Sequence, residues 1–544
     1  MGLRFIDKSV IEIIANAVRY RYKEPFDKKY SINGIIDRVR RMGKDMGTEV
    51  FQGGVFIPQV PFVGYHGNTT VMFPVCGDNI DNLSNAFSNC SGVYGSPACG
   101  DNVTNMYYAY YYCNHLTGSP ECGPLVTDMN YAYTVCYNLT GSPACGPSVI
   151  NMYRTYQNCY NLTGSPACED NVVNMFNTYH DCRNLTGSPA CGNNVENMAA
   201  AYYNCQNLTG SPACGPNVEN MANTYWACQN LTGSPVCGDN VVNMANTYIL
   251  CYNLTGNAAC GSSVRNMFNT YYNCRNLTGS PACGDNVINM INTYSGCYNL
   301  TGSPACGNNV VNMTSAYVNC RRLTGNPACG PKVTGMYNAY HNCQNLTGSP
   351  VCGDNVTQMR MTYSFCYNLT GSAACGPNVV DMGHAYWNCY NLTGSAVCGP
   401  KVADMTGAYF NCQNLTGISV CGNNVTSIVN TYYSCRNLTG LMLNRVIATT
   451  TSISLATAYC PNLKIYIAGP NTINFNSSIL NSMQNANAAA YYAFTDKTVS
   501  ENIWFNHLRT WNGYIDVDCG TSYQESNINN ICLYKAVYVR EYEE

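Results

Sequence analysis

Residues 136–146 have the sequence CYNLTGSPACG, and close copies of this stretch return every 23 residues through most of the chain. One series of 16 cysteines runs from Cys90 to Cys435, and a second series of 16 runs from Cys76 to Cys421, each at this spacing. Only Cys460, Cys519 and Cys532 fall outside the two series. No insertion or deletion breaks the period, which predicts one continuous array of structural repeats, a solenoid.

The repeat unit is V-x-x-M-x-x-[AT]-Y-x-x-C-x-x-L-T-G-S-P-x-C-G-x-x. Its apolar residues from Val to Cys have offsets of 0, 3, 7 and 10, a spacing typical of a helix with one inward face. The following Leu-Thr-Gly-Ser-Pro is too rich in Gly and Pro for a helix and predicts a short extended segment closed by a turn. The pattern therefore predicts an α/β repeat solenoid, a leucine-rich-repeat-like right-handed coil of 23-residue units.

Two stretches, NVTNMYYAYYYCNHLTG (102–118) and NVVNMFNTYHDCRNLTG (171–187), resemble the BspA-like class of leucine-rich repeats found on bacterial surface proteins. That class has V-x-N-M, an aromatic residue four positions later, Cys and Leu-Thr at the same offsets. The resemblance covers roughly residues 75–440, in about 15 copies. The chain departs from the class where T-G-S-P-A-C-G replaces an alternating Leu/Ile run. The resemblance implies surface binding or adhesion.

The chain is expected to divide into five parts. Residues 1–45 are predicted to form a helical hairpin, 46–74 a linker or first strand, and 75–440 the repeat solenoid. Residues 441–469, which contain ATAYCPNLKIYIAG, are predicted to be a degenerate capping repeat. Residues 470–544 are predicted to form a small C-terminal cap domain, with strands at 513–518 and 531–540.

The first part contains SVIEIIANAVRYRYKEPFDKKYSINGIIDRVRRMG (9–43), in which Ile11, Ile14 and Val18 share one helical face. Pro25 ends the first helix and Ser31 caps a second. This hairpin resembles the short N-terminal segment that precedes fibre or baseplate regions in many tailed-phage virion proteins. The resemblance implies attachment to a virion, and the alternative is an ordinary hairpin that caps the solenoid.

Two cysteines per unit raise the possibility of disulfide clamps or a metal site. No C-x-x-C occurs and the six histidines are out of register, so no metal is expected. Disulfides within a column would pair the coils two by two and break the equivalence of successive coils. Cys also packs readily as a small buried hydrophobic residue. We favour columns of free thiols over disulfides, with Cys113, Cys122, Cys136 and Cys145 as members of a structural ladder.

Thirteen Asn-Leu-Thr sequons, including those at Asn138 and Asn161, occupy another column. They would carry glycans if the chain met a glycosylating enzyme. The favoured alternative is an asparagine ladder, in which the side-chain amides stack and bond turn backbone groups.

The position after each first-series Cys holds long planar side chains and lies outside the apolar columns, so it is expected to face solvent. A solvated ridge in which neighbours stack on each other is the favoured interpretation, and a surface that binds sugar rings or a protein partner is the alternative. The candidate partner residues are Tyr137, Tyr160, Arg183, Gln206, Gln229, Tyr252, Arg275, Tyr298, Tyr367 and Tyr390.

Composition excludes several classes of protein. Charged residues make up 10% of the chain and the net charge is -3, which argues against a nucleic-acid binder. No run of apolar residues is long enough to span a membrane, and Asp7, Lys8 and Glu12 disagree with a secretory signal. No catalytic constellation is in register, so neither enzymatic activity nor a cofactor is expected. The excess of Tyr (45) over Phe (14) predicts rings with one edge in water.

The sequence thus favours a non-enzymatic structural protein of a tailed-phage virion, a rod-like fibre or appendage. Its expected partners are other virion proteins, through the N-terminal segment, and a host surface glycan or protein, with a homo-oligomer possible. It would be made in the host cytoplasm and exposed on the particle. The alternatives are a bacterial cell-surface adhesin of the BspA-like type and a pure spacer or ruler.

Overall fold

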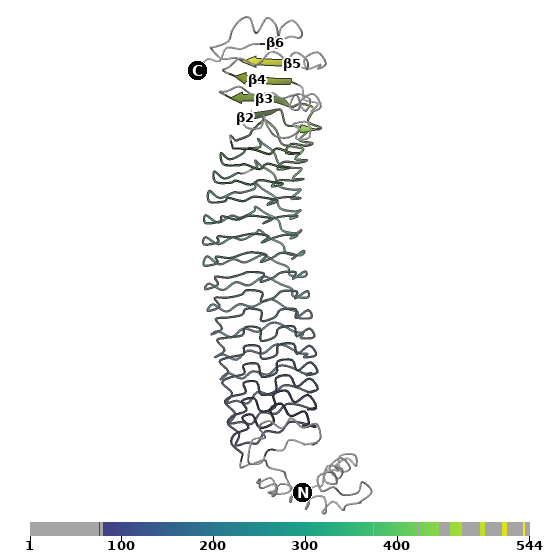
Figure 1. Ribbon diagram of the computed structural model, residues 1–544, viewed down its shortest axis with the longest axis vertical. Coiled ribbons are helices and arrows are strands. Elements are labelled where there is room, and N and C mark those ends of the chain that lie inside the picture. The colour runs from purple at the N-terminus through teal and green to yellow at the C-terminus, as the bar shows by residue number, and fades with distance from the viewer. Residues whose placement is uncertain are drawn as a thin grey trace, which may run out of the picture. The chain divides into compact units, whose positions relative to one another are not determined.

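The computed structural model describes residues 76, 80–373, 375–422, 424–444, 457–469, 490–495, 514–518 and 537–538. The chain divides into two compact units, Met1–Thr255 and Gly256–Glu544. In each unit the described chain winds in 23-residue coils that lie one above the next (Figure 1). The predicted repeat fold is therefore confirmed. The hairpin expected at 1–45 and the linker expected at 46–74 lie outside the described residues.

The helical part of the prediction is wrong for the repeats, because the described residues between 80 and 444 contain no α-helix. In the coil that begins at Val103, Tyr108 and Tyr112 have φ angles of 55° and 63°, in the left-handed region that a right-handed helix excludes. Their backbone N–H groups donate to the carbonyls of Asn130 and Thr134 in the next coil, at 3.0 and 2.9 Å. The backbone of this segment is therefore bonded between coils and not within a helix.

Tight turns explain why the apolar spacing suggested a helix. The N–H of Ala109 donates to the carbonyl of Met106 at 2.9 Å, and that of Cys113 to the carbonyl of Tyr110 at 3.2 Å. Such turns recur every three or four residues and send one side chain inward each time. Inward residues therefore repeat at nearly the helical period although each coil is a succession of turns.

The core consists of five apolar columns. In one coil they are Val149, Met152, Tyr156, Cys159 and Leu162, all with no exposed surface. The tyrosine rings of successive coils stack in parallel, and the Tyr156 ring lies 5.4 Å from the equivalent ring before it. Burial of each such side chain contributes about 1.5–3 kcal/mol before entropy is subtracted.

Polar atoms of the core are paired with backbone groups. The hydroxyl of Tyr156 donates to the carbonyl of Ala144 at 2.6 Å and accepts from the N–H of the same residue at 3.1 Å. The Cys159 thiol donates to the carbonyl of Tyr133, in the preceding coil, at 3.0 Å. The expectation that the abundant tyrosines keep one edge in water is therefore wrong for this column, in which the backbone replaces water.

In the Leu-Thr-Gly-Ser-Pro segment, a backbone hydrogen bond connects a coil to the coil before it. The N–H of Thr140 donates to the carbonyl of Gly118 at 3.0 Å. Gly141 has a φ of 82°, and a Cβ there would lie 2.1 Å from the Ser119 hydroxyl. Only glycine satisfies both the conformation and the close approach. Among the described residues before Ile418, adjacent coils form isolated parallel bridges and no strand.

A six-stranded parallel sheet follows in the second unit. Its strands are β1 (Ile418–Val420), β2 (Gly440–Asn444), β3 (Lys464–Gly469), β4 (Ala490–Thr495), β5 (Tyr514–Asp518) and β6 (Val537–Tyr538), and they pair in chain order. Figure 1 shows β2 to β5 as successive arrows. β2 and β3 register through Gly440 and Lys464. The strands expected at 513–518 and 531–540 correspond to β5 and β6, while the domain boundaries at 441–469 and 470–544 stay predictions.

Candidate ligand-binding surfaces

The planar column expected from the sequence forms a stacked ridge. We use the name ridge for the position after each first-series Cys. Tyr137 and Tyr160 stack at 5.1 Å with an interplanar angle of 8°, and the Arg183 guanidinium lies 5.1 Å from the Tyr160 ring. The tyrosines are half-buried and Arg183 is exposed. Each ring therefore covers one face of its neighbour and leaves its edge accessible.

The ridge has the same construction in the second unit. Tyr367 and Tyr390 stack at 5.2 Å and 3°. The Arg321 guanidinium lies 5.5 Å from the Tyr298 ring. The remaining candidate positions, Gln206, Gln229, Tyr252 and Arg275, occupy the same column. This geometry matches the stacking of neighbours expected from the sequence, and the binding of a ligand stays a prediction.

An aromatic cluster in the first unit was missed by the sequence reasoning. It comprises Tyr107, Tyr108, Tyr111, Tyr112, Tyr131 and Tyr153, and we call it the tyrosine cluster. Tyr108 contacts Tyr107 at 4.6 Å, Tyr131 at 4.3 Å and Tyr111 at 4.9 Å between ring centroids. Burial, and then the neighbouring Tyr131, raise the pKa of Tyr108 to about 12. The signal was visible in NMYYAYYYC (105–113), which adds four tyrosines to the one that the repeat requires.

One arginine lies against the tyrosine cluster. The Arg154 guanidinium is 5.7 Å from the Tyr131 ring, 5.3 Å from the Tyr153 ring and 5.9 Å from the Phe176 ring, within the range of cation–π attraction. Its Nε is buried and has no hydrogen-bond partner. The cluster therefore combines aromatic faces with one positive charge.

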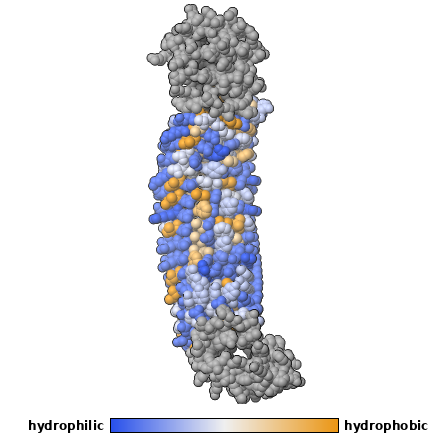
Figure 2. Space-filling model, viewed as in Figure 1, coloured by the Kyte–Doolittle hydropathy of each residue, from blue (hydrophilic) through white to orange (hydrophobic). Residues whose placement is uncertain are grey.

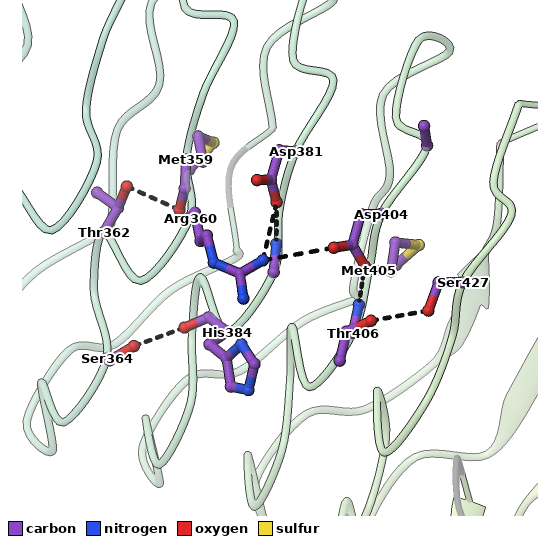
Figure 3. Close-up of polar contacts among 12 residues, drawn as sticks. Met359, Arg360, Thr362, Ser364, Asp381, His384, Asp404, Met405, Thr406 and Ser427 are labelled. Atoms are coloured by element: carbon purple, nitrogen blue, oxygen red, sulfur yellow. Dashed lines mark hydrogen bonds and ion pairs between the residues drawn. The ribbon is translucent and has the colours of Figure 1, made fainter.

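A second group of polar residues lies in the second unit (Figure 3). Nη1 of Arg360 is 3.8 Å from Oδ1 of Asp381 and 3.4 Å from Oδ2 of Asp404. Each aspartate also accepts the N–H of the residue two positions later, Gly383 or Thr406, at 2.8 Å. The aspartates therefore hold the turns and neutralise the arginine, which leaves no spare positive charge for an anionic ligand.

His384 lies beside this group and begins an aromatic stack. Its ring is 4.8 Å from Trp387, which stacks on Phe410 at 3.9 Å and 6°. Burial, and then the Arg360 charge, lower the pKa of His384 below its ordinary value of 6.5. Its Nδ1 is buried without a hydrogen-bond partner. The ring is therefore held neutral near pH 7.

The cysteine columns contain free thiols of two kinds. Cys113 and Cys136 are fully buried, whereas Cys122 and Cys145 are half-buried. Burial raises the pKa of Cys136 well above 9, and raises the pKa of Cys145 to about 11. Because the thiolate is the metal ligand and the nucleophile, these thiols are poor at both. Among the described residues no group of three or more His, Cys, Asp or Glu side chains is placed to hold a metal ion.

The exposed sequon asparagines contact one another along the stack. Nδ2 of Asn184 lies 3.4 Å from Oδ1 of Asn161, and Nδ2 of Asn207 lies at the same distance from Oδ1 of Asn184. Asn138 instead donates to the carbonyl of Asn114 at 2.6 Å. The long amide–amide distances indicate weak bonds.

In the view of Figure 2 the coloured surface is mostly hydrophilic, with scattered hydrophobic patches. Ile150, Val242 and Ile288 are examples of exposed aliphatic residues. Within the part of the chain that the structure describes, no helix is long and apolar enough to cross a membrane.

Comparison with known proteins gives no relative for this chain: no protein-family model matches it, and no curated protein sequence matches it. The likeness to BspA-like repeats and to tailed-phage segments therefore rests on the quoted motifs alone.

Proposed function

We propose that this protein is a non-enzymatic structural protein that presents a binding surface on repeated coils. The observation that carries the proposal is the ridge, where half-buried tyrosines such as Tyr137 and Tyr160 stack on one another and keep their edges accessible. The stacked rings lose little side-chain freedom when a partner binds, because their neighbours already hold them. A glycan or protein on a host surface is the proposed partner.

We place the protein on the virion of a tailed phage, as a fibre or appendage. The support is the resemblance of residues 9–43 to the N-terminal segments of such virion proteins. Other virion proteins would bind this segment, and the repeats would carry the host-binding surface. The alternative is that the protein is a bacterial surface adhesin of the BspA-like type. Antibody against the repeats should label purified phage particles if the protein belongs to the virion, and should not label them if it is an adhesin.

The binding role is tested by changing Tyr137, Tyr160 and Tyr252 together to Ala. We expect adsorption of the particle to its host to be lost while the circular dichroism spectrum is unchanged. The control changes Ile150, Val242 and Ile288 to Ala, which removes exposed apolar surface outside the ridge. Normal adsorption by the tyrosine variant would refute the binding role.

A spacer is the second candidate, and the indel-free 23-residue period favours it. In a spacer the number of coils sets the length of the projection, and the surface binds no partner. Deletion of two whole repeats would then shorten the projection seen by electron microscopy and leave adsorption unchanged.

A further inference from the structure

The residues in one column of the repeat have a left-handed backbone conformation. This column is the fifth residue after each Val, and its φ angles in the described coils lie between 52° and 60°. Asparagine adopts this conformation more readily than other residues with a side chain. It occupies eight of the described coils: Asn85, Asn177, Asn223, Asn246, Asn269, Asn292, Asn338 and Asn430.

Five of the other eight described coils have Ala200, Ser315, Met361, His384 or Gly407 in the column. The remaining three coils are consecutive. They place Tyr108, Tyr131 and Arg154 in the column, at φ angles of 55°, 58° and 56°. Large side chains are disfavoured there, and strained backbone positions gather at functional sites. Tyr108, Tyr131 and Arg154 are thus three successive large side chains in a column where asparagine is the commonest residue.

These three residues meet on one surface. The rings of Tyr108 and Tyr131 stack at 4.3 Å, and the Arg154 guanidinium lies 5.7 Å from the Tyr131 ring. Tyr107 and Tyr112 flank them with 38% and 43% of their surface exposed. The strained residues are therefore the centre of the tyrosine cluster, and a ligand can reach its edge.

The positive charge of this surface has no carboxylate partner in the described part of the chain. Arg183 lies 3.3 Å from Asp181, and Arg360 contacts two aspartates, but Arg154 forms no ion pair with another described residue. Because a guanidinium presents a planar fork of donors, it suits a carboxylate that arrives with a ligand. Flat aromatic faces beside it suit the C–H faces of sugar rings, and the phenol hydroxyls can bond sugar hydroxyls.

We propose that the surface formed by Tyr108, Tyr131 and Arg154, with Tyr107 and Tyr153 at its margin, binds a glycan that carries carboxylate groups. The accessible parts of the tyrosine side chains contact the sugar and Arg154 pairs with the carboxylate. This proposal rests on the proposed host-binding function. It adds a binding surface distinct from the ridge and assigns that surface a ligand class, an acidic polysaccharide.

Binding to immobilised alginate, a polymer of uronic acids, tests the proposal, with dextran as the neutral comparison. We expect the purified full chain to bind alginate in preference to dextran. Arg154→Gln should weaken alginate binding about tenfold or more, the size expected when a charge-assisted hydrogen bond is removed. Arg265→Gln is the charge-matched control, because it removes an exposed arginine outside the cluster, and it should bind as the unchanged chain does.

A second variant separates binding from folding. Tyr108→Asn with Tyr131→Asn installs the residue that the backbone prefers, so we expect lost alginate binding together with an unchanged or higher melting temperature. Equal affinity for alginate and dextran, or full binding by either variant, would overturn the proposal. Particles of the Arg154→Gln variant that still adsorb and bind alginate would refute this site while leaving the host-binding function intact.

Discussion

The hydroxyl of Tyr133 donates a hydrogen bond of 2.6 Å to the carbonyl of Glu121 and accepts one of 3.2 Å from the N–H of the same residue. One phenol thus satisfies both polar groups of a residue 12 positions earlier, inside the coil. The ring is also stacked at 5.4 Å on both of its neighbours, Tyr110 and Tyr156. Within each coil, the hydroxyl of the column tyrosine therefore bonds the turn segment to the segment that follows Gly-Ser-Pro. Between coils, the stacked rings pack successive coils together.

Removal of one such hydroxyl is expected to destabilise the fold. In Tyr225→Phe, the carbonyl and N–H of Ala213 would lose partners at 2.6 and 3.0 Å. An unsatisfied buried polar group costs about 1–3 kcal/mol, so the free energy of unfolding in urea should fall by about that amount. Tyr203→Phe, at a half-exposed ring, is the control and should change it little. Equal losses in the two variants would contradict this role for the hydroxyl.

The cysteine columns are expected to react only after unfolding. Burial raises the pKa of Cys145 to about 11 and that of Cys122 to about 12, so thiolate is scarce near neutral pH. Iodoacetamide should label few column thiols in the native protein. After denaturation without reductant it should label nearly all of them, as counted by mass spectrometry. A requirement for reductant would show disulfides and exclude the thiol ladder.

Acid is expected to destabilise the second unit through two histidines. Burial lowers the pKa of His341 and of His384 below the ordinary value of 6.5. A group with a lowered pKa stabilises the fold above its unfolded pKa, and that contribution is lost as the pH falls through the folded value. The urea midpoint should therefore decrease as the pH falls below about 6.5.

The local charges set the control for this pH dependence. His384 faces Arg360, which disfavours its protonation, and Asp381 and Asp404, which favour it. In His384→Gln with His341→Gln the decrease near pH 6 should be smaller, while any loss caused by aspartate protonation at lower pH remains. An identical pH profile for the double variant would rule out the histidines as its source.

The period and the core were predictable because they depend on residue type alone. Val, Met, Tyr, Cys and Leu recur in phase, and each of them is buried in the coil of Val149. The secondary structure was not predictable from the same spacing, since turns of three or four residues and a helix send side chains inward at similar intervals. Asparagine at positions such as Asn177 and Asn204 was the overlooked sign of a left-handed backbone.

The candidate surface was only partly predictable, for a related reason. The ridge is a column, so its position followed from the repeat and from residues such as Tyr137. The tyrosine cluster is a local departure from the repeat, and its members come from different columns of adjacent coils. The contact of Tyr108 with Tyr131 at 4.3 Å appears only when two coils are stacked. Such a departure can be recognised as unusual once the backbone conformation required at each column is known.

The energetic cost of the left-handed conformation can be measured directly at Asn292, where φ is 54°. Asn292→Gly should leave the free energy of unfolding nearly unchanged, because glycine adopts the left-handed conformation without strain. Asn292→Ala should lower it by about 1–2 kcal/mol, the cost of this conformation for a residue with a Cβ. Urea denaturation of the two variants, compared with the unchanged chain, gives both values. If alanine were tolerated as well as glycine, the column would impose no backbone constraint, and the tyrosines and arginine of the first unit would need no functional explanation.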